Sequence, residues 1–150
     1  MTVRLAPDVA AFLAAARVAR MATVDAAGAP LVLPICFALS GTRLFLSLDE
    51  KPKRRGPLDL ERVRNVRANP RVAVVADRWD EDWSRLAWVH LSGTARLALP
   101  DDEAETHRAA VALLREKYPP YRAMAIEARP LIAIDIERVK TWGALAAPQA

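Results

Sequence analysis

The side chains best suited to binding chemistry gather in a basic segment between Lys51 and Arg71. This segment holds eight Lys or Arg residues against two acidic residues, a local excess of six positive charges in a chain of formal net charge +4. Such a concentration favours a phosphate-bearing ligand or a nucleic acid, or it forms a solvated surface. Arg62 and Asn65 stand three residues apart, which places them on one face of a helix. Arginine also offers a planar fork of N–H donors that matches phosphate oxygens. The residues alone leave anion binding and a solvated surface open.

Other reactive residue types occur without the partners that metal binding or catalysis requires. His90 and His107 have no companion at metal-ligand spacing, and residues 77–82 lack the glycine and glutamate of a calcium loop. We therefore expect no metal site, and we name no catalytic acid or base. Cys36 is the single cysteine, so no internal disulfide forms. We interpret it as a small buried residue in a protein of the reducing cytoplasm.

Length and composition bound the architecture around these residues. With 150 residues, 53% hydrophobic and 27% charged, the chain supports one globular domain over residues 1–150. No apolar run is long enough to cross a bilayer, and the N-terminal region lacks the pattern of a secretory signal. We therefore expect a cytoplasmic protein without a membrane partner.

Hydrophobic periodicity predicts three helices and about six strands. The helices are expected over residues 7–18, 59–69 and 100–118, the last opened by a capping-box spacing of Asp102 and Glu105. The strands are expected over residues 20–24, 31–39, 43–48, 71–76, 86–97 and 131–139. Pro34 interrupts the second strand and implies a sheet edge or a bulge, because proline donates no ladder hydrogen bond. The short connections predict antiparallel pairing, and hence an α+β fold around an antiparallel barrel.

Three stretches, in this order along the chain, resemble the split β-barrel superfamily of pyridoxine 5′-phosphate oxidase. They are Ala22-Thr23 with Gly28, Pro30, Pro34 and Phe37; Arg64-Asn65-Val66 with Asn69-Pro70-Arg71-Val72; and Asp80 to Leu86 with Trp88-Val89. The third stretch is similar to superfamily members that use the deazaflavin coenzyme F420. The resemblance covers roughly residues 10–143, and it rests on the order and spacing of the motifs together.

The resemblance implies a homodimer with each cofactor site at the interface. By position, the residues that would hold the cofactor phosphate are Ser47 at a strand end, Lys51 and Lys53 in the following loop, and Arg62, Arg64 and Asn65 in the next helix. That loop is longer than in the superfamily pattern, so Arg54 and Arg55 are alternatives to the two lysines. Trp142 resembles the C-terminal segment that reaches the partner's cofactor.

A flat cofactor ring needs an apolar surface and free backbone groups along its polar edge. Pro34, Ile35 and Cys36 would offer both, because the proline interrupts the strand ladder there. An ordinary core strand with an edge proline is the alternative interpretation of the same residues.

Together these features predict an F420-dependent oxidoreductase that transfers hydride between the deazaflavin and a small unsaturated or quinone-like substrate. FMN is the alternative cofactor, in an oxidase or an electron-transfer flavoprotein, because both cofactors carry a ribityl phosphate. A nucleic-acid-binding module is disfavoured because no aromatic residue interleaves the basic segment. A haem- or tetrapyrrole-handling protein on the same fold is a further alternative.

Overall fold

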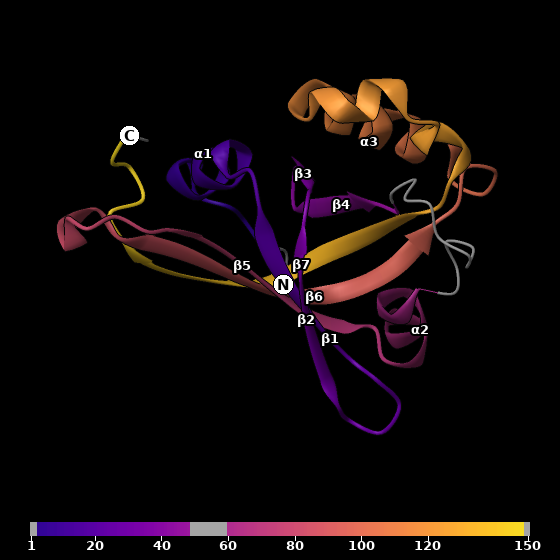
Figure 1. Ribbon diagram of the computed structural model, residues 1–150, viewed down its shortest axis with the longest axis horizontal. Helices are drawn as coiled ribbons and strands as arrows, with labels where there is room; N and C mark the ends of the chain where they lie inside the picture. The colour runs from indigo at the N-terminus through magenta and orange to yellow at the C-terminus, as the bar shows by residue number, and fades with distance from the viewer. Residues whose placement is uncertain (1–2, 49–59, 149–150) are drawn as a thin grey trace.

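The computed structural model describes residues 3–48 and 60–148, and its centre is a curved antiparallel sheet (Figure 1). In the described part of the chain the sheet has seven strands, in the order β2-β1-β5-β6-β7-β4-β3. They are β1 Ala19–Val24, β2 Pro30–Ile35, β3 Ala38–Ser40, β4 Arg43–Ser47, β5 Arg71–Arg78, β6 Ala87–Ala98 and β7 Leu131–Gly143. The predicted α+β class and antiparallel pairing are confirmed.

The two edge strands of this sheet are consecutive in the chain. β2 ends at Ile35 and β3 begins at Ala38, so only Cys36 and Phe37 join one edge of the sheet to the other. The sequence predicted a single strand over residues 31–39 with an interruption at Pro34. The structure has two strands there, because the chain leaves the ladder at Cys36 and not at Pro34. Pro34 pairs with Arg20 of β1 and lies in an edge strand, as its missing N–H predicted. The result is a barrel that is split between β2 and β3.

The two longest strands, β6 and β7, form a ribbon whose far end lies well away from α2 and α3 (Figure 1). Their pairing runs from Ala87 opposite Gly143 to Ala98 opposite Leu131, with a register shift at Ser92/Gly93. A Cβ atom on Gly93 would lie 2.2 Å from the Asp135 carbonyl oxygen, so only glycine permits this close approach. β7 continues past its predicted end at residue 139. We call the far end of the ribbon, residues 78–86 together with 142–148, the ribbon tip.

Three α-helices and three short 3-10 turns fill the connections in the described chain. They are α1 Pro7–Ala15, α2 Glu61–Ala68, η2 Trp83–Arg85, α3 Ala104–Lys117, η3 Pro119–Ala123 and η4 Ile126–Ala128. The predicted capping box in α3 is wrong, because the helix begins at Ala104 and its N-cap Glu103 makes no side-chain cap. The Glu103 carboxylate instead accepts from Arg96 at 2.6 Å and ties the helix start to β6.

Two apolar clusters hold the helices against the sheet. The larger cluster packs Phe12 and Leu13 of α1 and Val63 and Val66 of α2 against the strands. The smaller cluster lies beneath α3 and includes Leu114 with the two tyrosines that follow the helix. Full burial of each large apolar side chain contributes about 1.5–3 kcal/mol, so these contacts fix the helix ends relative to the strand ends. None of the helices in the described chain is long and apolar enough to span a membrane.

Candidate functional site

A small cavity lies where the ends of β2 and β4 meet the start of α2 and η3. Its volume is about 210 Å³, and we call it the strand-end pocket. The residues that line it are Val18, Pro34, Ile35, Cys36, Leu46, Ser47, Arg62 and Tyr121. Five of these eight were proposed from the sequence as cofactor-binding residues. The structure therefore brings together three separate stretches that the sequence could only associate by resemblance.

Two polar atoms of this pocket lack a hydrogen-bond partner among the described residues. They are Oγ of Ser47, whose side chain belongs to a residue only 4% exposed, and Nε of Arg62. A buried polar group without a partner costs about 1–3 kcal/mol, and more when the group is charged. Buried groups in folded proteins are nearly always satisfied, so this pair indicates a polar ligand. A hydroxyl and a guanidinium facing one cavity suit an anion, above all a phosphate.

Packing of α2 fixes the position of Arg62. Val63 and Val66 are buried, and the Asn65 side chain donates from Nδ2 to Thr23 Oγ1 of β1 at 3.0 Å. Because this bond anchors the helix one turn after Arg62, the guanidinium is held at the pocket. Asn65 itself is 4% exposed and does not line the pocket.

Behind Cys36 lies a group of residues that sequence analysis did not connect with the site. The Tyr118 hydroxyl accepts from the Phe37 backbone N–H and donates to the Arg17 carbonyl, both at 3.1 Å. The Lys117 ammonium sits 3.8 Å from the centre of the Phe37 ring. Burial, with a smaller contribution from the Arg17 guanidinium, lowers the pKa of Lys117 to about 8. No local pattern could have revealed contacts between residues some 80 positions apart, because periodicity reports only which side of a helix is apolar.

A known protein family matches almost the whole chain. The family described as pyridoxamine 5′-phosphate oxidase matches residues 5–143. The chain belongs to this family. No curated protein matches the sequence. Membership of this family therefore establishes the fold of the chain and does not by itself assign an activity.

Solved structures of several proteins share this family's fold. A conserved hypothetical protein, Rv2991, from Mycobacterium tuberculosis has a TM-score of 0.74 at 20% identity, over 99% of this chain and 92% of the other. An FAD-binding protein from Mesorhizobium loti has a TM-score of 0.68 at 23% identity, over 93% and 95%. The heme storage protein HutZ from Vibrio cholerae has a TM-score of 0.66 at 18% identity, over 94% and 95%. At these identities the likeness shows the split-barrel fold alone.

The remaining predicted site residues lie away from the strand-end pocket or outside the described chain. Arg64 is exposed on α2 and does not line the pocket, although it has contacts of its own. Lys51 and Lys53 lie outside the described residues. Trp142 is 52% exposed and lies at the ribbon tip, at the other end of β7 from β4.

One interpretation of Cys36 was wrong. The sequence predicted a small buried residue, whereas the thiol is exposed. The reason is the break in the strand, since Cys36 follows the last paired residue of β2 and no longer points into the core.

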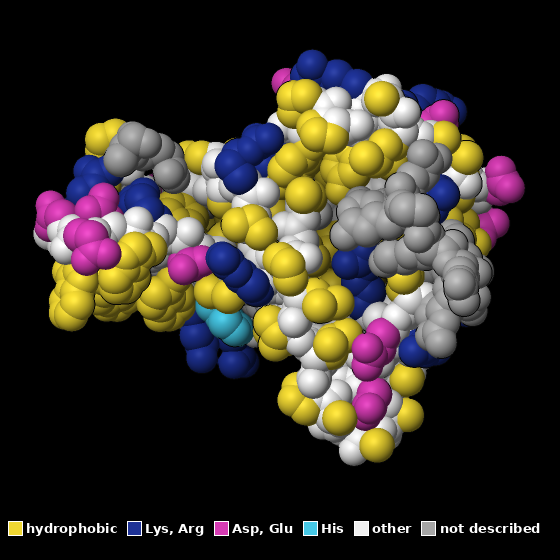
Figure 2. All heavy atoms as spheres, viewed as in Figure 1, with side chains coloured by type: hydrophobic (Ala, Val, Ile, Leu, Met, Phe, Trp, Pro, Cys, Tyr) yellow, Lys and Arg dark blue, Asp and Glu magenta, His cyan; other side chains and the backbone are white. Residues whose placement is uncertain are grey.

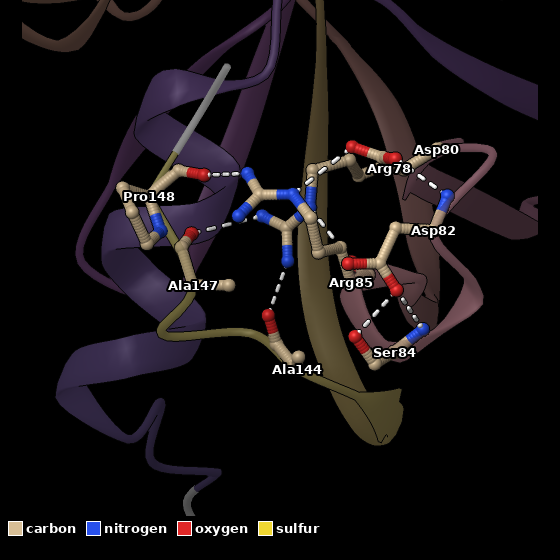
Figure 3. A network of polar contacts seen from close by, with 8 residues as sticks. All are labelled: Arg78, Asp80, Asp82, Ser84, Arg85, Ala144, Ala147 and Pro148. Atoms are coloured by element: carbon tan, nitrogen blue, oxygen red, sulfur yellow. Dashed lines mark hydrogen bonds and ion pairs between the residues drawn. The ribbon is translucent and has the colours of Figure 1, made fainter.

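The ribbon tip of this family member is a network of satisfied polar groups (Figure 3). The Arg78 guanidinium donates to the Arg85 carbonyl at 2.9 Å, to the Ala147 carbonyl at 3.2 Å and to the Ala144 carbonyl. Arg85 in turn donates to Asp80 at 3.0 Å and to the Pro148 carbonyl. The C-terminal segment is thereby fastened to the loop between β5 and β6. Asp80 and Asp82 of that loop take part in this network, Asp80 with Arg85 and Asp82 with Ser84.

Exposed aromatic side chains cover this tip. Trp79 and Trp83 are 65% and 69% exposed, and their rings meet edge to face with centroids 6.5 Å apart. Figure 2 shows hydrophobic and acidic side chains gathered at this end of the molecule. Exposed tryptophans on a rigid surface are typical of an interface rather than of a free surface.

A second, shallower depression lies on the face of the sheet formed by β1, β5, β6 and β7. We call it the sheet-face groove; it measures about 550 Å³ and is lined by Arg20, Val75, Asp77, Trp88, His90 and Lys140. Strand register places Arg20, Val75, His90 and Lys140 in one row across the four strands. Arg20 pairs with Asp77 at 2.8 Å. Within the described residues, no group of three or more His, Cys, Asp or Glu could hold a metal ion.

Proposed function

We propose that this protein is an oxidoreductase that holds a flavin-type cofactor by its phosphate in the strand-end pocket, with F420 favoured and FMN as the alternative. One observation carries the proposal: Ser47 and Arg62 line the same cavity, and Ser47 Oγ and Arg62 Nε are buried without a partner among the described residues. A phosphate would supply acceptors for both donors. Charge-assisted bonds of this kind are roughly twice as strong as neutral ones.

The dimensions of the pocket fit one end of such a cofactor. At about 210 Å³ it is smaller than the roughly 300–1,000 Å³ of pockets that bury a whole ligand. The phosphate end would therefore lie inside, against Ser47 and Arg62. The ring would lie outside, over the exposed residues Pro34 and Cys36.

A reduced deazaflavin supplies a hydride, and the proposed acceptor is a small unsaturated or quinone-like molecule that takes its proton from solvent. The chain's own residues bind and orient. Ser47 and Arg62 would anchor the phosphate, and the Pro34–Cys36 stretch would offer an apolar surface to the ring. We assign no acid or base.

The preference for F420 over FMN is electrostatic. Both carry a ribityl phosphate, but F420 also bears an anionic oligoglutamate tail. In the described chain, α2 also carries the exposed Arg64, two residues after the pocket residue Arg62. The cations from Lys51 to Arg55 lie outside the described residues.

We further propose that the working form is a homodimer in which a second copy covers the exposed half of the cofactor. A pocket that holds only one end of the ligand needs another surface to exclude water. The exposed tryptophans of the ribbon tip, Trp142 among them, are the apolar surface available for this contact. Light scattering at micromolar concentration should give a dimer, and a monomer that binds cofactor tightly would contradict the shared site.

Nucleic acid is less well supported as a ligand. Binding of single strands combines cations with stacked aromatic side chains. Here the exposed tryptophans gather at the acidic ribbon tip, whereas the exposed arginines of α2 lie at the other end of the molecule (Figure 1).

Binding of F420 and FMN to the purified apoprotein, followed by tryptophan fluorescence, tests the proposal. Lys51→Ala and Arg62→Ala should each weaken binding with little loss of fold, and Arg64→Ala, which changes an exposed arginine outside the pocket, should weaken it by less. A direct charge-assisted contact is worth about 1.5–3 kcal/mol, so the affinity should drop at least about tenfold. Arg67→Ala, on the same helix, is the matched control. Wild-type affinity in all three variants would show that the phosphate site is misplaced.

The sheet-face groove favours a second candidate, the binding of a tetrapyrrole. It combines a half-buried histidine, a tryptophan and two basic side chains, Arg20 and Lys140, which suit an apolar macrocycle with carboxylate groups. Haemin titration followed by its Soret band tests this candidate. His90→Ala should abolish the spectral change, and an unchanged titration in that variant would exclude the groove.

A further inference from the structure

Cys36 occupies an unusual place for a lone cysteine. Its thiol is exposed, in the two-residue link between the edge strands β2 and β3, and it is the only cysteine of the chain. It lines the strand-end pocket together with Ser47 and Arg62. Ser47 lines the same cavity, is more than nine-tenths buried, and has a hydroxyl without a partner among the described residues. The thiol therefore stands at the entrance of a built polar site rather than on an ordinary surface.

Two positively charged side chains belong to the surroundings of this thiol. Arg62, from α2, lines the same pocket, and its Nε has no partner among the described residues. The Lys117 ammonium lies against the ring of Phe37, the residue next to Cys36, and interacts electrostatically with the Cys36 side chain. Cations around a narrow opening raise the local concentration of anions. A reagent that carries negative charge should therefore reach this sulfur faster than a neutral one.

We propose that Cys36 is a modification site that forms a mixed disulfide with small anionic disulfides, and that this adduct and a phosphate-bearing ligand exclude each other from the strand-end pocket. The second half of the proposal rests on the function proposed above. The first half rests only on the position of the thiol beside Arg62.

The reaction is a thiol–disulfide exchange. The Cys36 sulfur, having lost its proton to solvent, attacks one sulfur of the incoming disulfide and forms a new S–S bond. The original S–S bond breaks, and the other half leaves as a thiolate with the bonding electron pair. Cys36 is oxidised and the leaving half is reduced, so no further oxidant is needed. In a cavity of about 210 Å³, the attached group and a phosphate would compete for the same space.

The first experiment compares two disulfide reagents on the full chain, the dianionic 5,5′-dithiobis(2-nitrobenzoate) and the neutral 4,4′-dithiodipyridine. Wild type should release one equivalent of thiolate per chain, and Cys36→Ser none. Arg62→Met should lower the ratio of anionic to neutral rate constants by at least about fivefold, because it removes a cation that lines the pocket. Arg67→Met is the control and should leave the ratio unchanged. Inorganic phosphate should slow the anionic reagent in wild type and not in Arg62→Met. An equal ratio in wild type and Arg62→Met would overturn the proposal.

The second experiment separates this inference from the proposed function. FMN and F420 are titrated into the unmodified protein, into the nitrobenzoate adduct, and into the adduct after reduction with dithiothreitol. We expect binding to be lost in the adduct and regained on reduction. Equal binding to adduct and unmodified protein would overturn the exclusion while leaving the proposed function intact. Absence of binding to the unmodified protein would refute the proposed function, and the rate comparison with phosphate protection would still decide the modification site.

Discussion

At the ribbon tip, Arg78 and Arg85 donate to four backbone carbonyl groups, whereas in the strand-end pocket Arg62 Nε has no partner among the described residues. At the tip, Asp80 also forms an ion pair with Arg85. Asp82 caps η2, because its carboxylate accepts a hydrogen bond from the Ser84 N–H at 3.1 Å. The ribbon tip exposes apolar tryptophan side chains, whereas two residues of the strand-end pocket have buried polar atoms without a partner among the described residues.

Arginine therefore has two different roles in these two regions. An arginine that donates from all three of its guanidinium nitrogens to main-chain carbonyls, as Arg78 does, holds a segment in place, and its removal should lower the free energy of unfolding. An arginine kept partly unsatisfied in a cavity holds binding energy for a ligand, and its removal should cost affinity instead. Proteins keep such unsatisfied groups at functional sites, where the local cost is offset elsewhere in the fold.

The largest expected effect is on stability, at the tip. Arg78→Met removes three hydrogen bonds from a charged donor and leaves three carbonyls in need of partners. We expect the free energy of unfolding in urea to fall by about 3 kcal/mol. Arg71→Met, on the same strand, should change it by less than about 0.5 kcal/mol. A stability loss in Arg78→Met no greater than in Arg71→Met would break the comparison from this side.

Arg62→Met probes the comparison from the pocket side. The substitution replaces the methylene stem of the arginine with an apolar side chain of similar length. It also removes the Nε–H donor, which has no partner among the described residues. The free energy of unfolding of the apoprotein should therefore stay within about 0.5 kcal/mol of wild type or rise. A loss as large as that of Arg78→Met would mean that Arg62 is structural.

Lys117 behind the pocket gives a pH-dependent effect of intermediate size. Its pKa of about 8 in the folded protein lies below the ordinary 10.5, so between these values the unfolded chain binds more protons and stability rises with pH. Below about pH 8 the penalty is constant. Lys117→Met should therefore be more stable than wild type at pH 7, and the difference should vanish as the pH approaches 10.5.

The size of that gain is limited by partial exposure and by the contact with the Phe37 ring, which favours the charged form. We expect at most about 2 kcal/mol at pH 7. Thermal melts of both proteins between pH 7 and 10 measure it. A pH-independent difference would show that burial of the ammonium is not its cause.

The smallest effect concerns the F420 tail. F420 should bind tighter than FMN, and longer glutamate tails tighter than short ones. Contacts to exposed arginines are screened, so each should add at most about 1 kcal/mol and fade as salt is raised. Titrations of long- and short-tailed F420 at two ionic strengths check this. Bound FMN that F420 cannot displace would contradict the preference.

Local sequence signals predicted much of the fold, including the edge position of Pro34 and the buried face of α2. They failed where a distant partner decides the outcome. The start of α3 depends on the ion pair between Glu103 and Arg96. The Asn65 side chain binds Thr23 of β1 and so holds α2 against that strand, instead of lining the pocket. The clamp of Arg78 on the C-terminal segment joins residues about 70 positions apart and has no local signature.

The pocket was predictable only in part, and for a similar reason. Resemblance placed Ser47 and Arg62 at the cofactor phosphate, and the needs of a flat ring placed the stretch from Pro34 to Cys36 against the cofactor. The structure does bring these residues together. The sequence could not show that the thiol is exposed, because that follows from the strand break between β2 and β3. Nor could it reveal Tyr121, which reaches the pocket through the packing beneath α3.

The central claim is that the strand-end pocket binds the phosphate of a flavin-type cofactor. The most direct test compares the affinity of FMN with that of riboflavin, which lacks the phosphate, and of F420 with its phosphate-free deazaflavin core. In wild type the phosphorylated form of the bound cofactor should be favoured by at least about tenfold, and Arg62→Met should remove most of that preference. Equal affinity of wild type for the phosphorylated and phosphate-free forms would contradict the claim.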